Sequence, residues 1–302
     1  MLANPDRWPS LLRLAAWYKL ATMPKSLTMR QIENYRRDGF VSPVPMLTAS
    51  ETAEYRHELE AVETSMGGEL IGAPRTKFYL RFPWAHRLAT HPKILDAVGD
   101  LIGPDILLYH NIAWLKDPGD DSYVSWHQDN TYFGHAPCDV LTVWIALSPA
   151  TAESGCMRIL PGTHKLGQLP LTTPDASDGN MLSSGQTVDF DAATINPVCM
   201  ALAAGEASIH HAFAIHGSHP NRANDRRLGI TFIYHPPGLR QLGNVRTSAM
   251  LVRGEDRFGN FETERPPTAA DDPATISRHE HSVGLYRDKV RELGNLTVTR
   301  FD

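Results

Sequence analysis

The stretch Trp126-His127-Gln128-Asp129 places an imidazole and a carboxylate two residues apart. In an extended strand, alternate side chains point to the same face, so we expect His127 and Asp129 to project together and Gln128 to point away. Two ligands do not complete a metal site. A third is available in His216, which ends an apolar segment typical of a strand. The stretch therefore predicts a metal site formed by His127, Asp129 and His216.

A set of two histidines and one carboxylate on one face of an octahedron leaves three positions open, as in non-haem Fe(II) oxygenases. A His-X-Asp pattern alone is common and favours an ordinary surface pair. A second segment strengthens the metal interpretation, because a turn after His216 leads to Arg227 and a further apolar strand. A hairpin there would bring Arg227 to the same cavity as His216. The arginine fork suits a carboxylate, and only one of Arg226 and Arg227 can point inward.

The composition places limits on the class of protein. The 302 residues are 42% hydrophobic and 21% charged, as in an ordinary soluble globular protein. The net charge of −5 argues against a general basic field for nucleic acid. Three irregularly spaced cysteines, Cys138, Cys156 and Cys199, favour a reducing compartment over a disulfide scaffold or a cysteine zinc site. We therefore expect residence in the cytoplasm.

The N-terminus carries an apolar stretch at 11–20 that Arg13 and Lys19 interrupt. A signal peptide would have a cleaner apolar stretch, and no run in the chain is long enough to span a bilayer. We expect no membrane partner. A short amphipathic helix at 11–20 is a possible contact with another subunit, and the oligomeric state stays open.

The chain in order predicts helices first and strands afterwards. Helices are expected after Thr28 with Gln31 completing a capping box, from Thr48 or Ser50 to Met66, from His91 to Gly103, and from Asp272 or Thr275 to Leu293. Six short strands are expected at 106–114, 123–127, 140–147, 156–160, 207–215 and 228–234. This spacing indicates a mainly β sandwich or barrel with a helical N-terminal segment.

We expect a single catalytic domain over 1–302. Within it, 1–104 would form a helical buttress, 105–237 the β core, and 238–302 a C-terminal loop and helix. The core contains an insertion at 167–200, which is polar and rich in turns between 170 and 197. Insertions of this kind are usually functional or disordered.

Several motifs in the same order resemble the phytanoyl-CoA dioxygenase family of Fe(II)- and 2-oxoglutarate-dependent oxygenases. These motifs are Trp126-His127-Gln128-Asp129, Trp144-Ile145-Ala146-Leu147, Gly155-Cys156-Met157-Arg158, Pro161-Gly162-Thr163-His164, and His216-Gly217-Ser218 with Arg227. They cover about 105–234, and the segment Arg37-Asp38-Gly39-Phe40 resembles the family's usual opening. The resemblance implies a double-stranded β-helix core of the jelly-roll or cupin-like kind.

The resemblance also implies roles for individual residues. His127, Asp129 and His216 would be the iron ligands, and Arg227 would bind the distal carboxylate of 2-oxoglutarate. Ser218 would share that carboxylate, and Trp144 would border the co-substrate. Ordinary structural roles are favoured for Lys116 and His110.

The implied reaction uses Fe(II), 2-oxoglutarate and O₂ to hydroxylate a C–H bond of a small molecule, with succinate and CO₂ as products. Related halogenases replace the carboxylate ligand by a small residue, so Asp129 favours hydroxylation. No basic groove for the phosphates of coenzyme A is evident in the sequence. An acyl-CoA substrate is therefore not favoured.

Two other functions use the same residues. The first is a zinc or other divalent-metal hydrolase or isomerase, which would not need Arg227 or Ser218. The second is a catalytically silent small-molecule-binding protein. Among the remaining polar residues, we expect Asn130, Tyr132 and His135 on the substrate side or in a solvent-exposed loop, His210-His211 in the core, and His279-Glu280-His281 on the surface.

Overall fold

The structure is a computed structural model that describes residues 23–68, 70, 73–172, 179–182 and 185–295. The helix predicted at 11–20 lies outside these residues. Within the described part of the chain, no helix combines the length and apolar character needed to cross a membrane.

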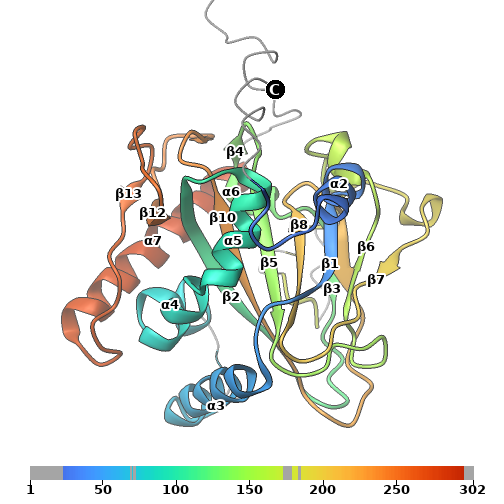
Figure 1. Cartoon of the computed structure of the whole chain (residues 1–302), viewed down its shortest axis with the longest axis horizontal. Helices are drawn as coiled ribbons and strands as arrows, with labels where there is room; N and C mark the ends of the chain where they lie inside the picture. The colour runs from blue at the N-terminus through green and yellow to red at the C-terminus, as the bar shows by residue number, and fades with distance from the viewer. Residues whose placement is uncertain (1–22, 69, 71–72, 173–178, 183–184, 296–302) are drawn as a thin grey trace, which may run out of the picture.

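The fold consists of a large sheet, a small sheet and a pair of short strands (Figure 1). The large sheet has the order β1 (Phe40–Pro45), β8 (Glu206–His211), β5 (Leu141–Ala146), β10 (Arg227–His235), β2 (Ile106–Lys116), β12 (Ser248–Arg253) and β13 (Glu262–Thr263). The small sheet has the order β3 (Val124–His127), β9 (His216–Ser218), β6 (Met157–Ile159) and β7 (Val198–Cys199). The pair is β4 (His135–Ala136) and β11 (Arg240–Gln241).

Most neighbouring strands run antiparallel, the exception being β12 and β13. The mainly β, jelly-roll prediction is confirmed. The large sheet extends outside 105–237, where we expected the core strands, because β1, β12 and β13 belong to it. The division of the chain into one domain stays a prediction.

The helices are α2 (Met29–Asp38), α3 (Ala49–Ser65), α4 (Pro83–Ala89), α5 (Pro92–Ile102), α6 (Asn130–Phe133) and α7 (Pro273–Asn295). Single turns of 3₁₀ helix are η2 (Ala73–Arg75), η3 (Phe78–Leu80), η4 (Thr163–Leu166) and η5 (Ala192–Thr194). Thr28 forms the capping box expected at the start of α2, and Thr48, one of the two expected caps of α3, forms a capping box with Glu51. Helix α4 is an element that sequence reasoning missed, although Pro83 in its first turn is a typical start signal.

The two faces of the large sheet have different partners. One face packs on the helices, with Val143, Ile145, Ile230 and Phe232 all fully buried in a core shared with α4 and α5 (Figure 1). The alternate residues of the same strands face a cavity that the small sheet also lines. Because successive side chains of a strand point to opposite faces, one face of these strands packs in the core and the other lines the cavity.

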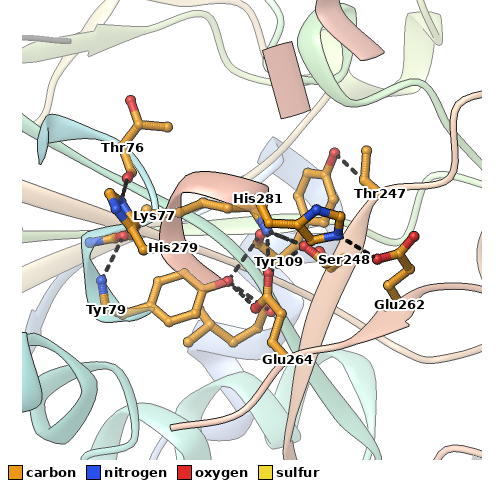
Figure 2. Close-up of polar contacts among 12 residues, drawn as sticks. Thr76, Lys77, Tyr79, Tyr109, Thr247, Ser248, Glu262, Glu264, His279 and His281 are labelled. Atoms are coloured by element: carbon orange, nitrogen blue, oxygen red, sulfur yellow. Dashed lines mark hydrogen bonds and ion pairs between the residues drawn. The ribbon is translucent and has the colours of Figure 1, made fainter. Parts of the chain in front are cut away.

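A buried ion pair joins the end of β13 to the segment between η2 and η3 (Figure 2). Glu264, just after β13, lies 2.6 Å from Lys77 Nζ, and its other oxygen accepts a 2.6 Å hydrogen bond from the Tyr79 hydroxyl. Ser248 donates to the same carboxylate at 2.7 Å. Both charged side chains are almost completely buried, so each depends on the other and on these hydrogen bonds for its stability.

One predicted strand is wrong. The segment 207–215 is not a single strand, because β8 ends at His211 and His216 begins β9 in the other sheet. Between them the chain turns, with Ala214 N donating to His211 O at 2.8 Å. The predicted hairpin between the His216 strand and the Arg227 strand is wrong for the same reason, since β9 pairs with β3 and β6 while β10 pairs with β2 and β5.

Candidate metal centre

Three side chains meet where β3 ends and β9 begins. His127 and His216 are register partners, and their ring centroids lie 4.1 Å apart. Asp129 Oδ1 lies 3.4 Å from His127 Nε2 and 3.5 Å from His216 Nε2. One ligand atom from each of the three residues lies within 4.8 Å of the other two. This spacing allows all three to bind one metal ion.

Asp129 reaches this position by a route that differs from the predicted one. The strand ends at His127, and Asp129 has helical backbone angles (φ −58°, ψ −37°) at the start of α6. A turn, and not the alternation of a strand, brings the carboxylate beside His127. Thr142 donates to Asp129 Oδ2 at 2.6 Å and His210 Nε2 lies 3.3 Å from that oxygen. Oδ1 is thereby left toward the two histidines.

The backbone orients both histidine rings. Nδ1 of His127 lies 2.9 Å from Ser125 O, and Nδ1 of His216 lies 2.9 Å from Ala214 O. Because a carbonyl oxygen can only accept, each Nδ1 carries a hydrogen and each Nε2 presents its lone pair to the centre. Burial lowers the pKa of His216 well below its usual range, and this neutral form is the one that binds a metal.

The electrostatics of Asp129 suit a ligand as well. Burial by itself would raise the pKa of this carboxyl group, but His216, His127 and His210 around it hold the pKa well below its usual range. The carboxylate is therefore ionised. Two imidazoles and one carboxylate form a donor set that divalent iron accepts.

A cavity of about 420 Å³ opens from this centre between the two sheets. Its walls are mostly apolar or aromatic, and they include Ile112, Val124, Phe133, Met181, Leu182 and Ile233. Helix α7 contributes Tyr286, Arg287 and Val290 to the lining. The cavity has the size and character of a small-molecule site.

The register of the central strands sets the positions of the polar groups along this cavity. Ile233 of β10 pairs with Thr142 of β5 and with His110 of β2, so these three lie at the level of Asp129. Arg227, at the start of β10, pairs with Lys116 at the end of β2. The three candidate ligands thus lie toward one end of the cavity, and Arg227, which lines the cavity beside Lys116, lies toward the other.

Arg227 is 2% exposed and reaches back along the cavity. Its guanidinium carbon lies 5.6 Å from the centroid of the Trp144 ring, and Nη1 donates to Gly155 O at 2.6 Å. Its Nε is buried and has no hydrogen-bond partner within the described residues. Burial lowers the pKa of Arg227 to about 10. An unsatisfied buried guanidinium N–H is a position where an anionic ligand would be stabilised.

Gly229 makes room for this arrangement. A Cβ atom at this position would lie 2.0 Å from the Trp144 ring. Trp144 can therefore lie flat across β10 only because the neighbouring strand has no side chain there. The tryptophan lines the cavity, and its place beside the co-substrate stays a prediction.

Ser218 and Lys116 lie beside each other at the cationic end. Lys116 Nζ donates to Ser218 Oγ at 2.9 Å and to His219 O at 2.6 Å. Lys116 is fully buried, and burial together with Arg227 lowers its pKa to about 6. Sequence reasoning favoured a structural role for Lys116. Its placement next to Ser218 and Arg227 makes it a candidate binding residue.

The other polar candidates divide into two groups. Tyr132 lines the cavity and donates to Gln186 Oε1 at 2.6 Å. His110 also lines the cavity, is 3% exposed, and has its ring 4.1 Å from that of Tyr286. The substrate-side prediction is wrong for His135, which is buried against aromatic rings including Tyr109.

The remaining predictions near the site have mixed outcomes. Asn130 is buried and its side chain bonds the backbone of His135, so it has a structural role. Gln128 does point away from the centre, where its amide donates to Gly167 O and Phe213 O. The surface prediction is wrong for His279, which is 1% exposed and lies 2.8 Å from Thr76 O.

The chain has clear similarity to proteins of known type. A family model described as phytanoyl-CoA dioxygenase (PhyH) matches residues 35–229. A probable alpha-ketoglutarate-dependent hypophosphite dioxygenase from Stutzerimonas stutzeri is 28% identical over 254 residues, covering 81% of this chain and 82% of the relative.

Two solved structures have the same fold. The non-heme monooxygenase ThoJ has a TM-score of 0.77 and 31% identity over 87% of this chain and 98% of its own. The epimerase SnoN in complex with Fe³⁺, alpha-ketoglutarate and nogalamycin RO has a TM-score of 0.59 and 26% identity, covering 70% of this chain and 84% of its own. Because the family model covers more than half of the sequence, this chain belongs to the phytanoyl-CoA dioxygenase family.

Proposed function

We propose that the protein is an Fe(II)- and 2-oxoglutarate-dependent oxygenase that hydroxylates an unactivated C–H bond of a small molecule. The observation that carries this proposal is the spacing of His127, Asp129 and His216 in one cavity with the buried Arg227. Family membership and the Fe³⁺ and alpha-ketoglutarate bound in the SnoN complex support the same metal and co-substrate.

We assign the iron to His127, Asp129 and His216, whose donor atoms converge and whose rings the backbone already orients. When bound, iron and 2-oxoglutarate supply the reduction of O₂ that oxidises the substrate, with succinate and CO₂ as products. The protein orients the reactants around the metal and excludes water from the cavity.

We assign the distal carboxylate of 2-oxoglutarate to Arg227, Ser218 and Lys116. The guanidinium and the ammonium carry the charge that this carboxylate needs, and the Ser218 hydroxyl lies within hydrogen-bond distance of Lys116. Trp144 forms the wall between this end and the metal level. The assignment also accounts for the burial of two basic residues, Arg227 and Lys116, whose side chains have no acidic ion-pair partner within the described residues.

We place the substrate on the other side of the metal level, against His110 and the residues of α7. Two strand spacings, or roughly 10 Å, separate Thr142 on β5 from His110 on β2 across the sheet. A small molecule that lies over Ile233 would fit between these two side chains. Its walls are largely apolar, so a mostly apolar substrate with a polar group toward His110 fits best.

Hydroxylation is the outcome that we favour over other reactions of such centres. Asp129 occupies the position that a halogenase would leave to chloride, and ThoJ is described as a monooxygenase. SnoN, which has the same fold, is an epimerase, so other reactions are known on this fold. A zinc hydrolase or isomerase would use the same three ligands and would leave Arg227 and Lys116 without a function.

The test is an anaerobic titration of the purified protein with Fe(II) and then 2-oxoglutarate. The wild type is expected to develop a visible metal-to-ligand charge-transfer band, and Arg227→Ala is expected to need far more 2-oxoglutarate for the same band. Arg226→Ala is the matched control, since Arg226 binds Glu63 and Asp117 instead of facing the cavity.

Absence of the band in the wild type, or equal 2-oxoglutarate requirements in the two variants, would contradict the proposal. A compound that stimulates succinate formation and itself gains one oxygen atom would then identify the substrate and establish hydroxylation. Residence in the cytoplasm and the oligomeric state stay predictions.

A further inference from the structure

Two cysteines lie against each other at the edge of the small sheet. Cys156 immediately precedes β6, and Cys199 ends β7, where it pairs with Arg158. Their sulfur atoms lie 2.7 Å apart. That separation is only about 0.7 Å longer than a disulfide bond of roughly 2.04 Å. Both residues are free thiols in the structure.

We propose that Cys156 and Cys199 form a modification site at which a low-molecular-weight disulfide, such as oxidised glutathione, produces a reversible intramolecular disulfide. The proposal rests on the position of the two thiols and does not depend on the proposed oxygenase activity. It goes beyond the expectation from cysteine spacing, which argued only against a disulfide scaffold.

The exposure of the two thiols sets the order of the steps. Cys199 is exposed and Cys156 is 2% exposed. Burial and the neighbouring Cys199 raise the pKa of Cys156 to about 12. Because the thiolate is the attacking form, Cys199 reacts first with a small disulfide, forming a mixed disulfide and releasing one small thiol.

The second step closes the protein disulfide. The Cys156 sulfur attacks the Cys199 sulfur of the mixed disulfide, and the second small thiol leaves with the proton that Cys156 loses. In total, two protein thiols are oxidised and one small disulfide is reduced to two thiols. A dithiol reductant reverses both steps.

The disulfide would connect the two ends of a segment that lines the cavity. The segment between the two cysteines carries Met181 and Leu182, which line the cavity, and Gln186, which accepts the hydrogen bond from Tyr132. The bond would tie the two ends of this segment together. It would also hold β6, whose Met157 pairs with Ser218 of β9. Oxidation is therefore expected to restrain one wall of the cavity.

The experiment uses intact mass and thiol titration after incubation of the full chain with oxidised glutathione. The wild type is expected to lose the mass of two hydrogen atoms and to fall from three reactive thiols to one under denaturing conditions, with both changes reversed by dithiothreitol. Cys138→Ser is the control and is expected to form the same disulfide. Cys199→Ser is expected to form none.

Two results would overturn the proposal: an unchanged mass, or a stable glutathione adduct on Cys199 that Cys156 does not displace. The oxidised wild type is also expected to unfold at a temperature higher by about 5 °C, because the bond closes a long loop of the unfolded chain. A lower unfolding temperature would overturn the restraining role. These measurements need neither iron nor 2-oxoglutarate, so failure of the oxygenase proposal would leave them unaffected.

Discussion

Thr142 is not a candidate metal ligand, but it orients one, the carboxylate of Asp129. Its hydroxyl holds Asp129 Oδ2 and leaves Oδ1 toward the two histidines. Thr142→Val keeps the shape and removes the hydrogen bond, so we expect 10- to 100-fold weaker metal binding. Anaerobic titration with Fe(II) or Co(II) measures this change.

The control for Thr142 is another threonine of the same cavity. Thr231 accepts a hydrogen bond from Trp114 and lies away from Asp129, so Thr231→Val is expected to keep the metal affinity. If Thr142→Val binds metal as tightly as Thr231→Val, the orienting role is wrong.

Lys116 predicts that 2-oxoglutarate binding takes up a proton. Burial lowers its pKa to about 6 in the free protein, whereas a bound carboxylate would favour the charged amine and raise that pKa. Above pH 6, binding therefore adds a proton, and the affinity falls as the pH rises, by up to about tenfold per unit. Calorimetry at pH 7.5 in two buffers of different ionisation enthalpy measures the uptake.

Lys116→Met provides the comparison. It keeps the length of the side chain, and its binding enthalpy is expected to be the same in both buffers. Identical enthalpies for the wild type would show that Lys116 does not change its protonation on binding.

At the scale of residues, the spacing of His127 and Asp129 was sufficient to predict that they lie together, although the reason was wrong. The turn at the start of α6 happens to direct the Asp129 carboxylate toward His127, as a strand would have done. The role of Lys116 could not be predicted, because it depends on the register between β2 and β10. No local pattern specifies which residue lies opposite Arg227.

At the scale of elements, five of the six predicted strands correspond to β2, β3, β5, β6 and β10, whereas shorter or more distant strands such as β1, β12 and β13 were not predicted. The sixth predicted strand, 207–215, is wrong because the chain crosses there from one sheet to the other. Ala212, Ala214 and Ile215 are fully buried there without belonging to a strand. A continuous apolar run does not distinguish a strand from a buried crossing, so the sequence alone did not reveal the break.

The buried pair of Lys77 and Glu264 makes the attachment of the C-terminal elements sensitive to one charge. Lys77→Met leaves the Glu264 carboxylate buried without its cation (Figure 2). We expect a loss of about 3–5 kcal/mol in the free energy of unfolding, measured by urea denaturation.

An exposed ion pair serves as the control for Lys77. Arg257 and Glu255 are both largely exposed, and Arg257→Met is expected to leave the urea midpoint unchanged. A small effect of Lys77→Met, equal to that of Arg257→Met, would show that Glu264 becomes protonated or hydrated at little cost.

At the scale of the whole molecule, buried histidines make the metal-free protein sensitive to acid. Burial lowers the pKa of His211 and of His235 to about 4 in the folded state, against about 6.5 when unfolded. Between these values the unfolded chain binds more protons, so stability is full above pH 6.5 and falls as the pH decreases toward 4. The slope is up to about 1.4 kcal/mol per pH unit for each histidine.

Urea denaturation at several pH values between 7 and 4 measures this slope. His235→Gln is expected to reduce the dependence of the unfolding free energy on pH by the contribution of one histidine, because His235 is fully buried. A stability that stays constant or rises between pH 6.5 and 4 would contradict the assignment of these histidines as neutral in the fold.

The fold of the whole molecule was predictable because strand lengths, turns and ordered motifs agree with one architecture. The packing of α7 over the cavity was not predictable. Its contacts join residues that are far apart in the sequence, such as Tyr286 and His110. The surface interpretation of His279 failed for the same reason, since its partner Thr76 lies in the N-terminal part of the chain.

The register of β10 has a consequence for how such an enzyme can diversify. Arg227 and Ile233 lie on one fully buried central strand. Under the proposed assignment of Arg227 to the distal carboxylate, the distance from Arg227 to the metal ligands limits the length of the dicarboxylate. Changing that distance would require the register of β10 to shift by one residue against its neighbours. Such a shift would turn each of its side chains to the opposite face of the sheet. The wall formed by α7 and by the segment between Cys156 and Cys199 has no such constraint. We therefore expect substitutions to change the substrate preference more readily than the length of co-substrate that the site accepts.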